Sequence, residues 1–136
     1  MAILGIDFGE KRLGLAISED RKFAFPLKVI LIKKTIEEII PEIEEICEEK
    51  NVKEIVIGLP LTLKGEEGEK AKQVKKFGNL LKEKLNLKII YEDERLTTKL
   101  VEALMHELNI SEKKFREKKD MIAAQILLQG YLEKSR

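Results

Sequence analysis

Aspartate is rare in this chain, and three of the four aspartates stand where structural elements are expected to end or begin. Asp7 follows the apolar run of residues 3–6, Asp93 follows a second apolar run, and Asp120 precedes the apolar residues 121–124. The chain covers its polar surface with Glu and Lys, so solubility does not require these aspartates. Carboxylate oxygens are the hard ligands that Mg²⁺ and Mn²⁺ prefer. The pattern therefore predicts a carboxylate cluster that holds a divalent metal ion.

Each of these acids also has a purely structural explanation. Asp7 could start a hairpin turn. The acids at 92–94 could cap the helix that follows, and Asp120 is a favourable N-cap residue. Strand alternation puts Glu92 and Glu94 on one face and Asp93 on the other, so at most two of the three reach one site from a regular strand. The residues alone leave the structural and functional explanations open at all three places.

Arginine is as scarce as aspartate, and its placement agrees with the acidic pattern. Arg12 and Arg95 each lie within five residues of a candidate carboxylate. The planar guanidinium group can contact phosphate through two parallel N–H groups, which a lysine cannot do. Residues 113–119 contain five basic side chains directly before Asp120. Such a segment can bind phosphate, although basic runs also occur simply as solvated surface.

The elements that must position these side chains follow from the apolar pattern. Thr35 and Glu38 have the spacing of a capping box. Pro41 is expected to kink the helix that contains it, because the apolar spacing continues across it. The first strand is expected to be central, since it is the most uniformly apolar. Strands are predicted over residues 2–8, 13–18, 27–32, 54–59 and 87–91, and helices over 36–46, from the loop at 65–68 to about 85, and over 97–108, 111–118 and 120–134.

This order of elements predicts an α/β protein with a five-stranded mixed sheet, made of a three-strand antiparallel meander plus parallel strands and flanked by helices. We expect a single domain over residues 1–136. No apolar run approaches the ~20 residues that a membrane span needs, so we expect a cytoplasmic protein with no membrane partner. The net charge of +1 provides no global field for nucleic acid, so any such binding relies on local basic patches.

Four motifs occur together in an order and spacing that resemble the YqgF family. They are Gly5-Ile6-Asp7-Phe8-Gly9-x-Lys11-Arg12-x-Gly14, Gly58-x-Pro60, Asp93-Glu94-Arg95-Leu96-Thr97-Thr98 and Asp120-x-x-Ala123-Ala124. The resemblance spans nearly the whole chain. Proteins of this family are described as pre-16S rRNA nucleases or as Holliday junction resolvase-like. The resemblance implies an RNase H-like fold and a metal-dependent nuclease, acting in 5′-end processing of precursor 16S rRNA during ribosome biogenesis.

The resemblance also implies roles for individual residues. Asp7, Glu94 and Asp120 become the catalytic acids and metal ligands, with Mg²⁺ or Mn²⁺ as the cofactor, and a further contribution from Asp93 is left open. Thr97 and Thr98 either bond phosphate or cap the next helix. The residues assigned to nucleic-acid binding are Lys11, Arg12, Arg95, Lys113, Lys114, Lys118 and Lys119.

Other functions remain compatible with the residues. A Holliday junction resolvase would act on branched DNA, and symmetric cleavage would require a dimer; the sequence leaves monomer and weak dimer open. A non-catalytic nucleic-acid-binding module would not need the three acids. An ATP-binding protein of the actin and sugar-kinase type would need two such domains, and 136 residues supply one.

Overall fold

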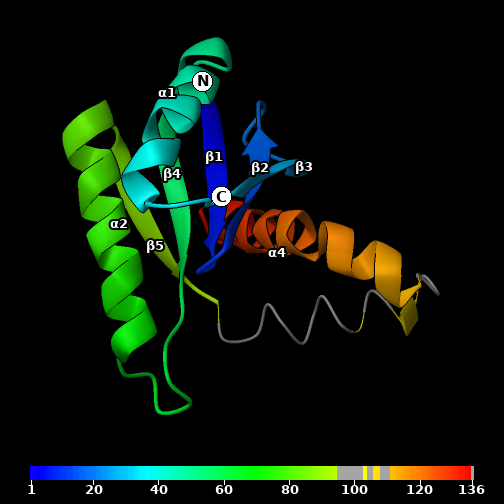
Figure 1. Ribbon diagram of the computed structural model, residues 1–136. Coiled ribbons are helices and arrows are strands. Elements are labelled where there is room, and N and C mark those ends of the chain that lie inside the picture. Colours follow the sequence, from blue (N-terminus) through cyan, green and yellow to red (C-terminus); the bar gives the residue numbers. More distant parts are fainter. Residues whose placement is uncertain (95–102, 104–105, 108–110, 136) are drawn as a thin grey trace.

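A five-stranded sheet forms the centre of the computed structural model, which describes residues 1–94, 103, 106–107 and 111–135 (Figure 1). The strand order is β3-β2-β1-β4-β5. Strands β1, β2 and β3 form an antiparallel meander, and β4 and β5 run parallel to β1. The predicted mixed sheet with a central first strand is therefore confirmed. The strands span Ala2–Phe8 (β1), Arg12–Ser18 (β2), Phe25–Leu31 (β3), Val52–Leu59 (β4) and Lys88–Asp93 (β5).

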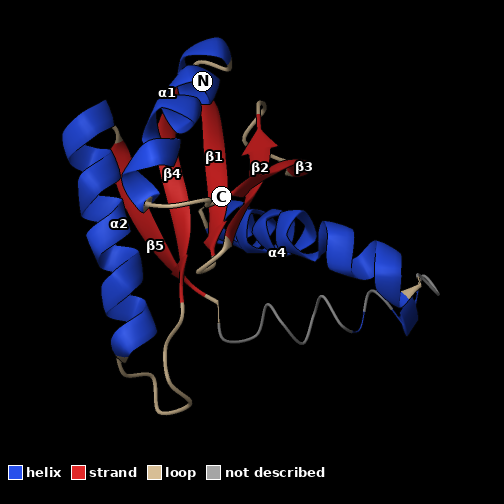
Figure 2. Ribbon diagram, viewed as in Figure 1, coloured by secondary structure: helices blue, strands red, loops and turns tan. Residues whose placement is uncertain are grey.

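Helices cover both faces of this sheet (Figure 2). A 3₁₀ turn (η1, Ile36–Ile39), helix α1 (Ile40–Glu49) and helix α2 (Glu69–Leu85) lie on one face, and helix α4 (Glu112–Lys134) lies on the other. The helix predicted over residues 97–108 falls largely outside the described residues. No helix in the described part of the chain is long and apolar enough to cross a membrane.

Alternation along β1 divides its side chains between two hydrophobic cores. Leu4 and Ile6 belong to the larger core, beneath α1 and α2, whereas Ile3 packs in a smaller core beneath α4. Because side chains two residues apart share a face of a strand, Asp7 lies on the same face as Ile3. Packing of the central strand therefore aims the first candidate acid toward α4.

Helix α4 approaches the sheet closely where the sheet has no side chain. Gly14 of β2 is the register partner of Asp7, and a Cβ atom at Gly14 would collide with the backbone carbonyl of Asp120. Only a glycine leaves room for the helix backbone at this point. The glycine in the first family motif thus lets Asp120 lie beside the carboxyl end of β1.

Asp120 lies inside α4 rather than at its start, so the predicted helix boundary before it is wrong. The helices predicted over residues 111–118 and 120–134 form one continuous helix. Ser111 is its N-cap, and the Ser111 side-chain oxygen accepts a hydrogen bond from the backbone N–H of Lys114 at 3.3 Å. Lysine and arginine have good helix propensity, so the basic segment extends the helix outward. This position excludes the capping explanation for Asp120.

Two details of the first helical segment also differ from prediction. Thr35 makes no side-chain capping bond, so the expected capping box is absent. Pro41 stands in the first turn of α1, directly after η1, instead of kinking a longer helix. A proline is well tolerated there because the N–H group that it lacks would have no partner inside the helix.

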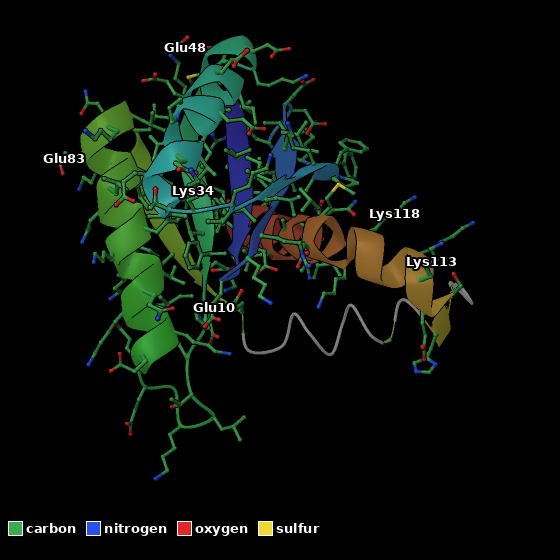
Figure 3. All side chains as sticks on the ribbon, viewed as in Figure 1. Glu10, Lys34, Glu48, Glu83, Lys113 and Lys118 are labelled. Carbon is green, nitrogen blue, oxygen red and sulfur yellow. The ribbon has the colours of Figure 1, made fainter. Side chains whose placement is uncertain are left out.

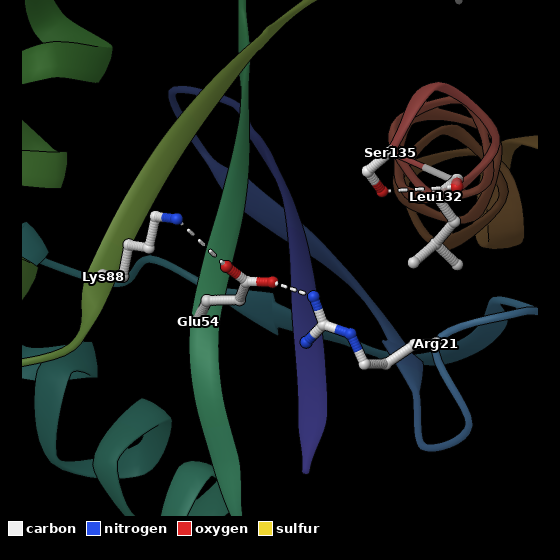
Figure 4. A network of polar contacts seen from close by, with 5 residues as sticks. All are labelled: Arg21, Glu54, Lys88, Leu132 and Ser135. Carbon is white, nitrogen blue, oxygen red and sulfur yellow. Dashed lines mark hydrogen bonds and ion pairs between the residues drawn. The ribbon is translucent and has the colours of Figure 1, made fainter.

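A polar network stabilises the edge of the sheet opposite the candidate acids (Figure 4). Glu54, near the start of β4, is only 7% exposed and accepts a 2.7 Å hydrogen bond from Arg21. Lys88, at the start of β5, lies 3.9 Å from the same carboxylate. A buried carboxylate needs such partners because its desolvation costs several kcal/mol. The network joins the turn after β2 to the amino ends of β4 and β5.

The close approach at Gly14 predicts a sharp difference between two glycine substitutions. Gly14→Ala forces the new methyl group against the α4 backbone, and should lower the free energy of unfolding by about 1–3 kcal/mol. Gly130→Ala, in α4 with no atom near its added Cβ, should raise it by up to about 1 kcal/mol. Urea denaturation of both variants measures this. Equal stability of the two variants would contradict the packing described for α4.

Candidate active site

Asp7 and Glu94 come together across the carboxyl ends of β1, β4 and β5. Asp7 is the penultimate residue of β1, and Glu94 directly follows β5. The Glu94 N–H donates a 3.2 Å hydrogen bond to the carbonyl of Leu59, which extends the ladder with β4 by one residue. A Cβ atom on Gly58 of β4 would touch the Glu94 carboxylate. The missing side chain at Gly58 therefore lets Glu94 reach across β4 toward Asp7.

The carboxyl groups of Asp7 and Glu94 lie within hydrogen-bonding reach of each other. Glu94 donates a hydrogen bond to Asp7. Burial raises the pKa of Glu94 to about 8, and the neighbouring Asp7 charge and the hydrogen bond itself add to the effect. Burial also raises the pKa of Asp7, and the charge of Asp120 acts in the same direction. Two buried carboxylates at this separation cannot both ionise without a compensating positive charge.

Asp120 is the third acid, and it is held by an arginine. The Nε of Arg12 donates a 2.8 Å hydrogen bond to the Asp120 carboxylate. The ion pair joins the first residue of β2 to α4, and its acidic side chain is 19% exposed. Asp120 remains close enough to Asp7 for their charges to repel. Arg12, which we predicted to contact phosphate, is therefore occupied with a candidate metal ligand in this structure.

The three predicted acids thus gather around one point without forming a closed cluster. Among the residues that the structure describes, no three acidic, His or Cys side chains are grouped tightly enough to hold a metal ion. Asp7 and Glu94 contact each other, whereas Asp120 pairs with Arg12.

A pocket of about 430 Å³ opens beside the acid pair. Asp7 and Glu94 line one wall, and Lys70 and Gln73 of α2 line another. The positive charge of Lys70 opposes the rise in the pKa of Glu94. Sequence reasoning missed Lys70 and Gln73. Lysine is so common in this chain that nothing in the sequence distinguishes this one.

The other predicted residues lie in several different settings. Lys11 is exposed in the turn after β1. Lys119 lies close enough to Asp7 to oppose the rise in its pKa. Lys113 and Lys118 project from the outer half of α4, beyond the sheet (Figure 3). Lys114 is also exposed and belongs to the same half of α4. By strand alternation, Asp93 lies on the opposite face from Glu94. Arg95, Thr97 and Thr98 lie outside the described residues.

The shared proton predicts a pH-dependent stability of the metal-free protein. Glu94 keeps its proton to a pKa of about 8 when folded, against an ordinary value of 4.5. Between these values the folded state binds more protons than the unfolded chain, so the free energy of unfolding falls as the pH rises. Glu94→Gln should flatten this fall.

Urea denaturation in the presence of a chelator, at several values between about pH 5 and pH 9, measures the effect. Glu45→Gln is the matched control, because Glu45 is exposed on α1. That control should follow the wild type. An equally steep fall in all three proteins would show that Glu94 does not hold the proton.

Comparisons with known proteins place this geometry in a family. The family described as "RuvX: Holliday junction resolvase" matches residues 1–134. A Syntrophomonas wolfei protein named "Putative pre-16S rRNA nuclease" is 38% identical over 133 residues, covering 98% of this chain and 94% of its own length. A Protochlamydia amoebophila protein of the same name is 41% identical over 138 residues, covering 96% of this chain and 92% of its own.

A solved structure shares the fold at low sequence identity. Thermus thermophilus RuvC in complex with a Holliday junction substrate superposes with a TM-score of 0.62 and 15% identity, covering 99% of this chain and 95% of the other. This match confirms the predicted RNase H-like fold. The extent of the family match and the identity to its named relatives confirm the resemblance found in the sequence. The chain belongs to the RuvX family, also called YqgF.

Proposed function

We propose that this protein is a metal-dependent nuclease that hydrolyses phosphodiester bonds in precursor 16S rRNA. The observation that carries the proposal is the meeting of Asp7 and Glu94 at the mouth of a pocket, with Asp120 within electrostatic reach. These acids come from three different elements: β1, the end of β5, and α4. Folding alone does not require three acids at one place, because their charges repel one another. The names of the family and of its relatives support the same activity.

The donor set fits a hard divalent cation such as Mg²⁺ or Mn²⁺. Mg²⁺ keeps several waters and needs only one or two carboxylates in addition to substrate phosphate oxygens. Asp7 and Glu94 would supply these carboxylates, and Asp120 would add a third. When bound, such ions activate the attacking water and stabilise the leaving oxygen of the phosphodiester.

The protein's own residues prepare the site for this cation. Asp7 and Glu94 hold a proton where positive charge is required, so the site is already built for a positive partner. The positive charges of Lys70 and Lys119 favour the ionised forms of Glu94 and Asp7, which are the forms that bind a cation. Loss of the shared proton frees both carboxyl groups as oxygen ligands. The surrounding burial that raises the two pKa values also strengthens electrostatic attraction to a cation.

The outer half of α4 is suited to guide the nucleic acid to the acids. Lys113, Lys114 and Lys118 are exposed, and Lys119 lies at the point where the helix reaches Asp7. Figure 3 shows Lys113 and Lys118 on the part of the helix that extends past the sheet. A basic helix half beside an acidic site can hold the phosphate backbone while the acids hold the metal. This separation of charges explains how a chain with a net charge of +1 binds a polyanion.

Substitution of the acids tests the proposed activity. Asp7→Asn and Asp120→Asn should each abolish cleavage, because each removes a carboxylate from the site. Asp7→Asn should leave stability unchanged or slightly raised, since it removes repulsion with the neighbouring acids. Asp120→Asn should lower stability by at most about 1 kcal/mol through loss of a partly exposed ion pair.

The assay uses purified protein with precursor 16S rRNA and Mg²⁺, Mn²⁺ or chelator. Asp20→Asn provides the matched control, because Asp20 lies in the exposed turn after β2 and bonds only to nearby groups. That variant should cleave at the wild-type rate. Cleavage that survives in Asp7→Asn and Asp120→Asn would reveal a contaminating nuclease or a different site.

The role of α4 predicts a change in salt dependence. Replacing Lys113, Lys114, Lys118 and Lys119 together by Ala should weaken binding and reduce the slope of log affinity against log salt by about one unit per lost phosphate contact. Binding is measured with Asp7→Asn protein, which cannot cleave. A control that replaces Lys50, Lys53, Lys82 and Lys84 by Ala removes the same charge elsewhere. A slope reduced equally in both would assign the effect to net charge.

A second candidate substrate is branched DNA. The family description names a Holliday junction resolvase, and the RuvC structure that shares this fold carries a junction substrate. A four-way junction, incubated under the same conditions as the precursor rRNA, separates the two proposals. Symmetric nicks in the junction with no cleavage of rRNA would favour the resolvase. Precise cleavage of the rRNA alone would favour rRNA processing.

A further inference from the structure

A second pocket adjoins the candidate active site on the side of the sheet that α2 covers. It has a volume of about 450 Å³ and lies between η1 and α2. Phe8, Glu10 and Gln73 line both this pocket and the one that contains the acids. The two pockets therefore share part of their lining near the end of β1. The function proposed above uses only the first of them.

Strand alternation explains why the two pockets differ in chemistry. Asp7 and Phe8 are consecutive in β1, so their side chains point to opposite faces of the sheet. Asp7 lies on the α4 side and lines the polar pocket, whereas Phe8 lines both pockets and packs with the core beneath α1 and α2. A substrate phosphate held beside Asp7 thus has an aromatic surface one residue away, around the edge of the sheet.

This aromatic surface is rigidly supported. The ring of Phe8 lies 4.9 Å from the ring of Phe77, with an angle of 32° between their planes. Phe77 is only 2% exposed, whereas Phe8 is half-buried and lines the pocket. Ile36 and Leu80, both half-buried, extend the apolar lining. A flat, uncharged group would find an apolar wall here with its shape already fixed.

The rim of the pocket argues against a phosphate group and in favour of a base. Glu10, Glu37 and Glu83 stand on the rim against a single lysine, Lys76, among the residues that line it. These carboxylates repel phosphate and accept hydrogen bonds from N–H groups. The side-chain amide of Gln73 can both donate and accept at the junction of the two pockets. Nucleobases combine flat apolar faces with such donors and acceptors.

We propose that the near end of this pocket, at Phe8 and Gln73, binds a nucleobase of the nucleotide next to the scissile phosphate. The proposal rests on the nuclease function above and adds to it a base subsite in the adjoining pocket between η1 and α2. The substrate would have to present an unstacked base, because a base paired within a helix could not turn around the end of β1. Single-stranded parts of an RNA precursor meet this requirement.

The test compares an intact single-stranded RNA oligonucleotide with versions that lack one base on either side of the cut. For the wild type, removal of the bound base at one of these positions should lower kcat/KM about tenfold, or about 1.4 kcal/mol, because the base loses its stacking on an aromatic ring. Phe8→Leu should cleave intact and abasic RNA equally, at the rate at which the wild type cleaves abasic RNA. Its retained cleavage of abasic RNA also shows that the variant is folded.

Phe25→Leu is the matched control, because Phe25 is 59% exposed on the edge strand β3 and lines neither pocket. It should keep the wild-type dependence on the base. If the wild type cleaves intact and abasic RNA equally at both positions, the base subsite is refuted while the nuclease function stands. An equal loss with Phe25→Leu and Phe8→Leu would also refute it.

A binding measurement keeps the base subsite and the nuclease function separable. The RNA carries the fluorescent base 2-aminopurine at the tested position, and the protein is kept in chelator so that no cleavage occurs. Stacking on Phe8 should quench the fluorescence in the wild type and Phe25→Leu but not in Phe8→Leu. Quenching that depends on Phe8, without cleavage under any metal condition, would support the subsite and refute the nuclease function. Binding with no such dependence would refute the subsite.

Discussion

Repulsion between carboxylates in a partly buried site is the constraint on which this structure depends. Three acids from distant parts of the chain meet at one edge of the sheet, and no arrangement of the bare protein leaves all of them charged without a positive partner. Burial and the neighbouring charges raise the pKa of Glu94 to about 8, and Arg12 pairs with Asp120. In the function proposed above, a metal ion would displace the proton from Glu94, and a substrate phosphate would compete for Arg12.

Two glycines leave the space that allows the three acids to approach one another. Gly14 admits the α4 backbone beside β1, and Gly58 leaves a path for Glu94 across β4. Alternation along β1 then directs Asp7 toward α4 and Phe8 toward an apolar pocket. The stabilising network around Glu54 lies at the opposite edge, so the demands of stability and of chemistry are met at different ends of the same sheet.

The spacing of apolar residues correctly predicted the strands of the sheet and their order along the chain. The uniform apolarity of β1 predicted its central position, which the strand order confirms. The sequence patterns were misleading where a residue fits two local structures about equally well. Pro41 fits a helix start as well as a kink, and Asp120 resembles an N-cap although Ser111 caps the helix two turns earlier.

The features that sequence reasoning missed are those created by tertiary packing. Lys70 lines the pocket because α2 packs against the sheet beside it. The sequence contains many lysines, and nothing in it distinguishes Lys70 from the others. The pairing of Arg12 with Asp120 spans 108 positions, and no local pattern encodes it. The pocket beside Phe8 arises from the packing of η1 against α2. The spacing of residues in the sequence indicated which side chains are candidates for catalysis. Their contacts in the folded protein show which of these side chains interact.

The central claim is that the acid pair of Asp7 and Glu94 exchanges its shared proton for a divalent cation. The most direct measurement is calorimetric titration of the purified protein with Mn²⁺ near neutral pH, repeated in buffers of different ionisation enthalpy. We expect saturable binding with release of roughly one proton per site, since Glu94 holds its proton up to a pKa of about 8. Glu94→Gln should release none. Saturable binding without proton release in the wild type, or no binding at all, would contradict the account.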